Sequence, residues 1–129
     1  MATTVKLRAG PLEAEFEDGG LRAIVYDGVE IVRGVYAAVR DRDWDTVTPE
    51  VDVRQLRQSE GETKVLFQCR HARDEIDFEW DGTIDMSEDG VRFDFDGIAR
   101  ASFLKNRIGF CVLHPMEFAG LPVDVHTEE

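Results

Sequence analysis

The sequence of 129 residues is short of positive charge and of long apolar runs. Its 15 lysines and arginines against 27 aspartates and glutamates leave a net charge of −12, which repels nucleic acid and anionic membrane surfaces. No stretch approaches the ~20 apolar residues of a membrane span. The N-terminal run MATTVKLRAG lacks the apolar centre of a signal peptide. These absences predict a cytoplasmic protein with no nucleic-acid or membrane partner.

Cysteine and histidine are also scarce. Cys69 and Cys111 form no CxxC pair, and His71, His114 and His126 are too scattered for a zinc site, so no metal is expected. The chain has no phosphate loop, dinucleotide fingerprint or nucleophile elbow, and we expect no cofactor. Each cysteine lies inside an expected strand as a small buried hydrophobe, and a disulfide would require those two strands to be neighbours.

What the chain has in abundance is alternation of apolar and polar residues, the period of a β-strand. The clearest case runs from Ile76 to Met86, apolar on one face and almost wholly acidic on the other, and it pairs across Glu88-Asp89-Gly90 with Val91 to Phe95. Asp18-Gly19-Gly20 and Asp27-Gly28 are further hairpin signals. His71 continues the apolar face of the run before Ile76 and is expected in the core at a strand end.

Nothing in the sequence supports a long helix. The best helical candidate, residues 52–59, is short, and its flanking valines alternate as well in a strand. Turn signals recur about every 8–12 residues, as they do in antiparallel sandwiches and barrels. The sequence therefore predicts an all-β antiparallel β-sandwich of roughly ten strands, forming one domain over residues 1–129.

The run from Asn106 to Pro115, NRIGFCVLHP, is apolar and nearly uncharged inside an otherwise acidic protein. Apolar residues on both of its faces predict a central strand, covered on both sides. Arg107 and His114 would then lie at the two ends of that strand, where a ligand could reach them. The alternative is that Arg107 extends its guanidinium into water and that the backbone satisfies His114.

The segment from Val39 to Thr48 gathers arginines, aspartates and one tryptophan, among them Arg40 and Trp44. Guanidinium and carboxylate groups suit the hydroxyls and carboxylate of a sugar acid, and Trp44 could stack on the apolar face of a sugar ring. The alternative is a solvated loop with ion pairs worth ~0–1 kcal/mol each.

A row of acidic residues, Asp77, Glu79 and Asp81, stands on one strand face at ~7 Å intervals. Mutual repulsion within such a row could raise a pKa and supply a general acid. A solvated sheet face is the commoner use of this pattern, and we favour it.

Two phrases carry a family resemblance: GGLRAIVYDGVEIVRGVYAAVRDRDWDT, residues 19–46, and KNRIGFCVLHPMEFAGLPVDV, residues 105–125. They resemble the N-terminal part of the apionate lactonase-like proteins, bacterial enzymes of branched-sugar-acid breakdown, and more loosely the galactose mutarotase-like supersandwich. The resemblance implies that a β-sandwich opens a longer chain with further domains after it. Alternation at Val123 and Val125, which reads as the start of another strand, agrees with that expectation.

Three hypotheses for the function follow. In the first, the sandwich is non-catalytic and supports a downstream catalytic domain of a sugar-acid lactonase. In the second, it binds a sugar or sugar acid itself and acts as a lactonase, mutarotase or epimerase. The resemblance then suggests His114 as general base and Glu117 as general acid, with Arg40 and Arg107 as carboxylate clamps beside Trp44. In the third, it is a homo-oligomerisation module, which requires an exposed apolar sheet edge.

Overall fold

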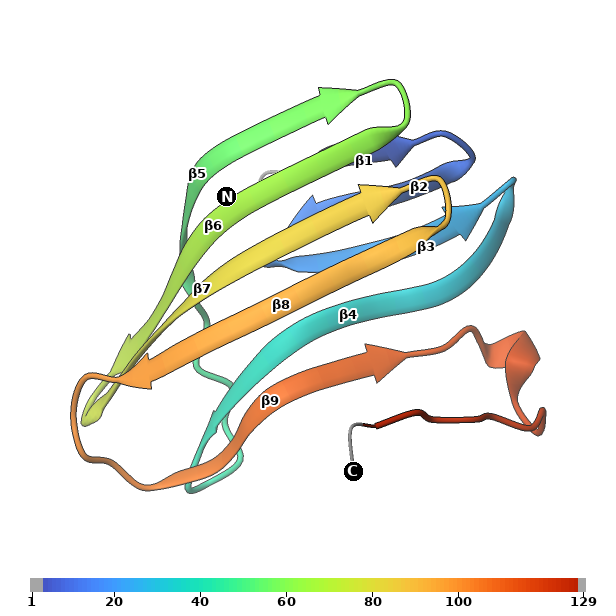
Figure 1. Cartoon of the computed structure of the whole chain (residues 1–129). Coiled ribbons are helices and arrows are strands. Elements are labelled where there is room, and N and C mark those ends of the chain that lie inside the picture. The colour runs from blue at the N-terminus through green and yellow to red at the C-terminus, as the bar shows by residue number, and fades with distance from the viewer. Residues whose placement is uncertain (1–3, 128–129) are drawn as a thin grey trace.

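The computed structural model describes residues 4–127 and confirms an all-β sandwich (Figure 1). Over those residues the chain forms nine strands and one 3-10 helix. The elements are β1 (Val5–Ala9), β2 (Leu12–Glu17), β3 (Gly20–Tyr26), β4 (Val29–Asp41), β5 (Glu50–Ser59), β6 (Glu62–Arg73), β7 (Ile76–Ser87), β8 (Gly90–Ala99), β9 (Lys105–Leu113) and η1 (Met116–Phe118).

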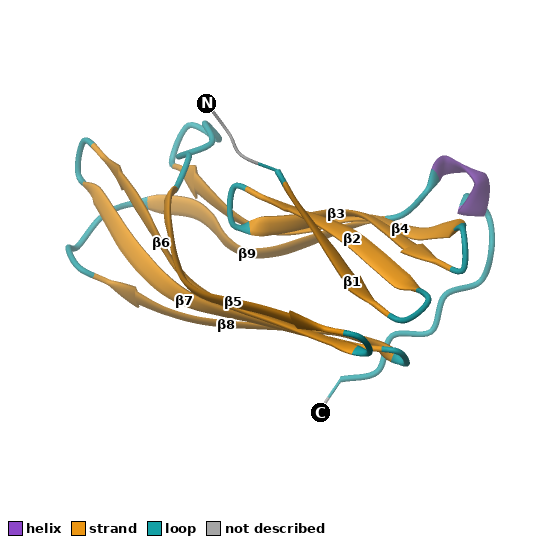
Figure 2. Cartoon of the chain, turned by 90° about the horizontal axis from the view of Figure 1, so that it is seen from above, coloured by secondary structure: helices purple, strands orange, loops and turns teal. Residues whose placement is uncertain are grey.

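Two antiparallel sheets face each other (Figure 2). One has the strand order β1-β2-β3-β4-β9 and the other the order β5-β6-β7-β8. The chain crosses between the sheets twice, through the segment 42–49 after β4 and through the segment 100–104 after β8. Within each sheet, consecutive strands are joined by tight turns.

The hairpin turns follow from the residues that were expected to form them. Asp27 and Gly28, between β3 and β4, have φ of 49° and 84°, and Asp18 and Gly19, between β2 and β3, have φ of 52° and 76°. Positive φ at both central residues is the geometry that matches the twist of the flanking strands, and Asp-Gly adopts it at low cost. The helical candidate over residues 52–59 is part of strand β5.

The core lies between the sheets and is centred on Phe67 of β6. The Phe67 ring contacts Phe16 and Trp80 edge-on, with centroids 5.0 and 5.3 Å apart, and reaches Phe93 at 6.0 Å. Phe67 lies directly across the β6–β7 ladder from Gly82, and its ring occupies the space where a Cβ on Gly82 would stand. The missing side chain at Gly82 is thus what lets the central ring lie flat against β7.

The prediction that residues 106–115 form a central strand is wrong. Residues 106–113 belong to β9, which pairs with β4 and ends its sheet. Phe110, Val112 and Leu113 keep 36%, 51% and 46% of their surface exposed. Apolar residues on both faces predicted a strand with neighbours at both edges and both faces covered. In the structure β9 has a neighbouring strand at one edge only, and its two faces are partly exposed. Period-two patterning reports which faces are apolar, not what covers them.

The two cysteines lie in different sheets, Cys69 buried on β6 and Cys111 half-buried on β9, and both are free. Burial, with a smaller contribution from Asp18, raises the pKa of the Cys69 thiol to about 12, so that it stays protonated at neutral pH. Across residues 4–127 no helix is long and apolar enough to cross a membrane.

Replacing Gly82 by alanine tests the centre of the core. The added methyl group would collide with the Phe67 ring, and we expect the free energy of unfolding to fall by about 1–3 kcal/mol, the usual cost of overpacking. The matched control is Gly109→Ala, also within a strand, where nothing lies within 4 Å of the new Cβ. Urea unfolding of both variants measures the difference, and equal stability of the two would contradict the packing described.

Candidate functional site

A gap in the five-stranded sheet forms the candidate site. The register between β3 and β4 begins at the pair Leu21–Val35, and β9 occupies the opposite edge of β4. Residues 42–49, which we call the return segment, follow β4 and bond to the same edge of that strand further along: the Val47 N–H donates to the Val39 carbonyl at 2.9 Å. Between these two partners, the edge of β4 around Ala37 faces a pocket of about 590 Å³.

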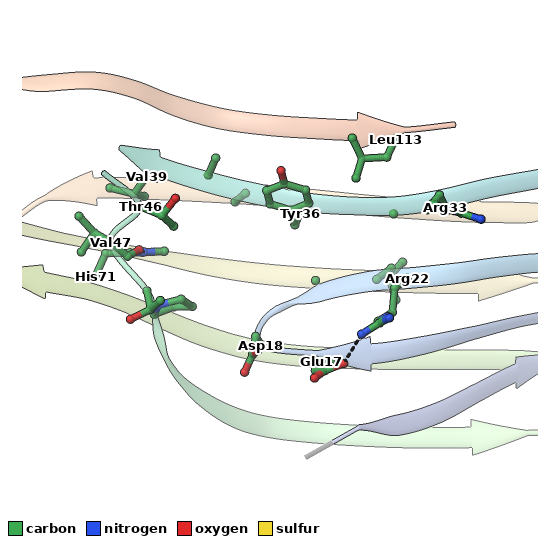
Figure 3. Close-up of a pocket in the computed structure, with 17 residues that line it drawn as sticks. Glu17, Asp18, Arg22, Arg33, Tyr36, Val39, Thr46, Val47, His71 and Leu113 are labelled. Carbon is green, nitrogen blue, oxygen red and sulfur yellow. Dashed lines mark hydrogen bonds and ion pairs between the residues drawn. The ribbon is translucent and has the colours of Figure 1, made fainter. Parts of the chain in front are cut away.

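Tyr36 lies between the two ends of this pocket (Figure 3). The small residues Gly34 and Ala38 flank it on the same strand face and leave room on either side of its ring. Among the described residues, the Tyr36 hydroxyl has no hydrogen-bond partner. The polar lining is supplied by the β2–β3 hairpin, β4, the return segment and β6: Glu17, Asp18, Arg22, Arg33, Thr46, Thr48 and His71.

The two arginines of the pocket are held by neighbouring carboxylates. Arg22 donates to Glu17 at 3.0 Å, and Arg33 donates to Glu30 at 3.1 Å. Both guanidinium groups are largely exposed, and exposed ion pairs contribute ~0–1 kcal/mol. An incoming carboxylate could therefore compete for either arginine, which gives this end of the pocket the chemistry to hold an organic anion.

His71 lies at the other end of the pocket and is 1% exposed. Trp80 Nε1–H donates to His71 Nε2 at 2.9 Å, and His71 Nδ1 lies 2.7 Å from the Val47 carbonyl. Because an indole N–H can only donate, Nε2 must be the acceptor and Nδ1 carries the proton. Burial lowers the pKa of His71, and the hydrogen bond to Val47 opposes this in part.

Both ring nitrogens of His71 are therefore occupied by the fold. The imidazole is neutral, fixed in one tautomer, and has no lone pair or proton left for a substrate. This confirms the expectation, made from the apolar face it shares with Phe67, that His71 is a core residue at a strand end.

The Arg/Asp-rich segment forms a loop closed upon itself. Asp41 accepts the backbone N–H groups of Asp43 at 2.9 Å and Asp45 at 3.0 Å, and its other oxygen accepts Arg73 at 2.6 Å. Desolvation acts to raise the pKa of Asp41, but these donors outweigh it and hold the pKa below its usual value. The carboxylate of Asp41 is thus a structural anion and not a proton donor.

Arg40 and Trp44 lie together in this loop. The Arg40 guanidinium donates to Thr46 Oγ1 at 2.8 Å and lies 3.4 Å from the Trp44 carbonyl. Trp44 has a φ of 68° and is 61% exposed, so its indole stands free of the core. Arg107 is the register partner of Arg40 on β9 and donates to the Phe110 carbonyl at 3.3 Å.

The proposed acid and base lie elsewhere. His114 and Glu117 follow the far end of β9 and are exposed. His114 lies seven positions after Arg107, which is about 23 Å along an extended strand. The structure brings Arg40, Trp44 and Arg107 to one end of the β4–β9 pair and His114 and Glu117 to the other. None of these five residues lines the pocket, and their roles stay predictions.

Two of the three acidic residues of the row on β7 are paired with arginines. Asp77 accepts Arg70 through both oxygens, at 3.0 and 2.9 Å, and Glu79 accepts Arg100. The hydrogen bond from Arg70 is the main cause that lowers the pKa of Asp77, the opposite of what a general acid needs. Across residues 4–127, no group of three or more His, Cys, Asp or Glu side chains is placed to hold a metal ion.

Sequence reasoning missed the pocket. One signal was there to read, because Gly34 and Ala38 flank Tyr36 at period two, and small residues on both sides of an aromatic mark a hollow on a strand face. The other half of the pocket forms where the return segment contacts β4, and no pattern in the local sequence predicts that contact.

A family model described as D-apionate lactonase, N-terminal domain, matches residues 1–129. A curated protein named D-apionate lactonase, from Brucella anthropi, is 40% identical over 128 residues, which cover 96% of this chain. The chain spans about a fifth of that relative's length, 21%. No solved structure matches the chain.

The buried neutral state of His71 predicts a pH dependence of stability. Its pKa is lowered in the folded protein, so below its unfolded value of about 6.5 the unfolded chain takes up a proton that the folded chain does not. Stability should therefore be constant above pH 6.5 and fall, by at most about 1.4 kcal/mol per pH unit, as the pH decreases from there towards the folded pKa.

Urea unfolding between pH 5 and 8 measures this slope. His71→Gln should abolish it, whatever the variant's absolute stability. His114→Gln serves as the control and should keep it, since the His114 side chain is exposed in the folded protein. A slope that survives in His71→Gln would show that another group is responsible.

Proposed function

The chain belongs to the family of D-apionate lactonase N-terminal domains, and on that premise we propose that it is a non-catalytic β-sandwich module of a sugar-acid-metabolising protein. Its role is to support a catalytic domain that follows it in the same polypeptide. The relative is named a lactonase, so the reaction we assign to the complete protein is the hydrolytic opening of a sugar-acid lactone. The presence of that catalytic domain after this one is also proposed.

The observation that carries this proposal is the state of the titratable groups. Lactone opening needs a base and an acid within hydrogen-bond reach of one reacting centre. His71 has both nitrogens occupied, and arginines hold Asp41 and Asp77 as carboxylates. The predicted acid–base pair, His114 and Glu117, is exposed and lies a strand's length from the arginines predicted to clamp a substrate.

A second candidate function rests on the pocket beside Tyr36. An aromatic ring between two small residues, two arginines and a free strand edge are groups that could bind a sugar acid. In this alternative the sandwich itself binds a sugar or sugar acid and acts as a lactonase, mutarotase or epimerase. The roles predicted for His114, Glu117, Arg40, Arg107 and Trp44 belong to this alternative, although none of the five lines the pocket.

Alanine variants in the complete protein separate the two functions. For a supporting module, His114→Ala and Arg107→Ala should each leave kcat/KM for sugar-acid lactone hydrolysis within about twofold of the unmodified protein. Loss of a general base would instead cost about 100-fold or more. His126→Ala, another exposed histidine after β9, is the control for unspecific effects. A large loss in both test variants with the control unaffected would favour catalysis by this domain.

A ligand screen tests the pocket directly. We expect aldonic acids, their lactones and simple hexoses to leave the melting temperature of this chain unchanged. A ligand that raises the melting temperature by an amount that increases with the logarithm of its concentration relative to its Kd would establish binding. Arg22→Gln should then weaken the shift, whereas Arg92→Gln should not, although Arg92 makes an ion pair of the same 3.0 Å length on the other sheet. That pattern would favour the second function.

A further inference from the structure

The two long sides of the sandwich are built differently. On one side β1 is joined to the facing sheet by the Gln58 side chain, which donates through Nε2 to the Lys6 carbonyl at 3.2 Å and accepts the Arg8 N–H through Oε1 at 3.1 Å. The Thr63 hydroxyl adds a bond to the Arg8 carbonyl. Hydrogen bonds between side chain and backbone therefore close this side.

The opposite side, formed by β8 and β9, is open. No hydrogen bond joins these two end strands within the described part of the chain. They meet through aromatic rings, with Phe110 of β9 at 5.0 Å from Phe93 and 5.6 Å from Phe95. All three rings stay partly exposed, whereas Phe67 at the centre of the sandwich is 2% exposed. The core thus continues to the open side without being sealed there.

An apolar strip runs along this side. We define it as Phe110, Val112, Leu113 and Met116, which are 36%, 51%, 46% and 84% exposed. Phe110 and Val112 belong to the inner face of β9, and Leu113 to its outer face. Three of these residues belong to the end strand β9 and Met116 to η1, and exposed apolar area gathered at one sheet edge marks a surface that another polypeptide covers.

The two end strands β5 and β9 differ in the charged residues that they carry. β5, the end strand of the other sheet, carries Glu50, Asp52, Arg54 and Arg57, and such charges keep a free edge from pairing with other chains. Between Ile108 and Leu113, β9 carries none, in a protein whose net charge is −12. Its free edge is therefore left competent for strand pairing.

We propose that the part of the polypeptide that follows this domain docks on the apolar strip and pairs with the free edge of β9. The inference rests on the proposed function, because a supporting module needs a fixed interface. In the 40% identical relative, about four fifths of the chain lies outside the aligned region. The tail after η1 turns back on the β9 side of the sandwich (Figure 1), with Val123 and Val125 exposed, so the described chain ends on this open side.

Hydrogen exchange in the complete polypeptide tests the docking. Peptides from β9 should exchange at least about tenfold more slowly than peptides from β5, although both strands end their sheets in the isolated fold. Val112→Lys should raise exchange in β9 by about tenfold, the change expected when one valine loses its burial. The matched control is Val53→Lys on β5, a valine of similar exposure, 45%, which should change β9 by less than about twofold.

The outcomes are distinguishable. Fast exchange in β9, or equal effects of the two lysine variants, would overturn the inference. Protection of β9 that disappears on dilution, with a dimer in sedimentation, would assign the strip to a second copy and overturn it as well. Exchange in β6 must stay slow in both variants, which shows that the sandwich remains folded.

Lactone hydrolysis, measured on the same variants, separates docking from function. If Val112→Lys loosens β9 and activity is unchanged, the docking is upheld and the supporting role fails. If Val112→Lys lowers activity while β9 stays protected, the docking fails and the supporting role survives.

Discussion

The hydrogen-bond chain from Trp80 through His71 to the Val47 carbonyl is the interaction on which the arrangement of the two sheets depends. It joins three segments, β7, β6 and the return segment that carries the chain from one sheet to the other. Because each buried polar atom in it has its partner, the core contains an imidazole and an indole N–H without an unsatisfied group. The same chain fixes the end of the pocket, since Val47 also bonds to Val39 of β4.

The contacts between the two sheets differ from one side of the sandwich to the other. The Phe67 ring fills the centre because Gly82 makes room for it, and Trp80 and Phe16 pack on its edges. Towards β1 the sheets are joined by hydrogen bonds from Gln58 and Thr63. Towards β8 and β9 aromatic contacts continue but nothing seals them, and Phe110 and Val112 reach solvent. The β1 side is thus closed by hydrogen bonds, and the β8–β9 side is the one that we propose as an interface.

The sequence predicted where the strands of this fold lie along the chain better than it predicted which strands are adjacent in the sheets. Alternation over β7 and the Asp-Gly turn after β3 are local, and local rules describe them. The place of β9 at the end of its sheet depends on which strands pair, and no local pattern contains that information. For the same reason the predicted site split in two, because residues close in the chain, such as Arg107 and His114, are separated by the length of an extended strand.

The residue types of the Arg/Asp-rich loop predicted a site for a sugar acid, and that role stays a prediction. Asp41, the carboxylate at the start of the loop, is already bonded to Arg73 of β6 and to the loop backbone. Composition cannot tell a site that awaits a ligand from a loop that has already paired its groups. The pocket beside Tyr36 has less charge and more free space, and it went unseen because two segments distant in sequence form it.

The central claim is that this domain is a support whose apolar strip belongs to an interface within one polypeptide. A crystal or cryo-electron microscopy structure of the complete protein with a sugar-acid lactone bound tests it most directly. The account predicts Phe110 and Val112 buried against residues beyond position 129, and the lactone bound in the downstream part. A structure with β9 in solvent and the lactone held beside Tyr36 would contradict it.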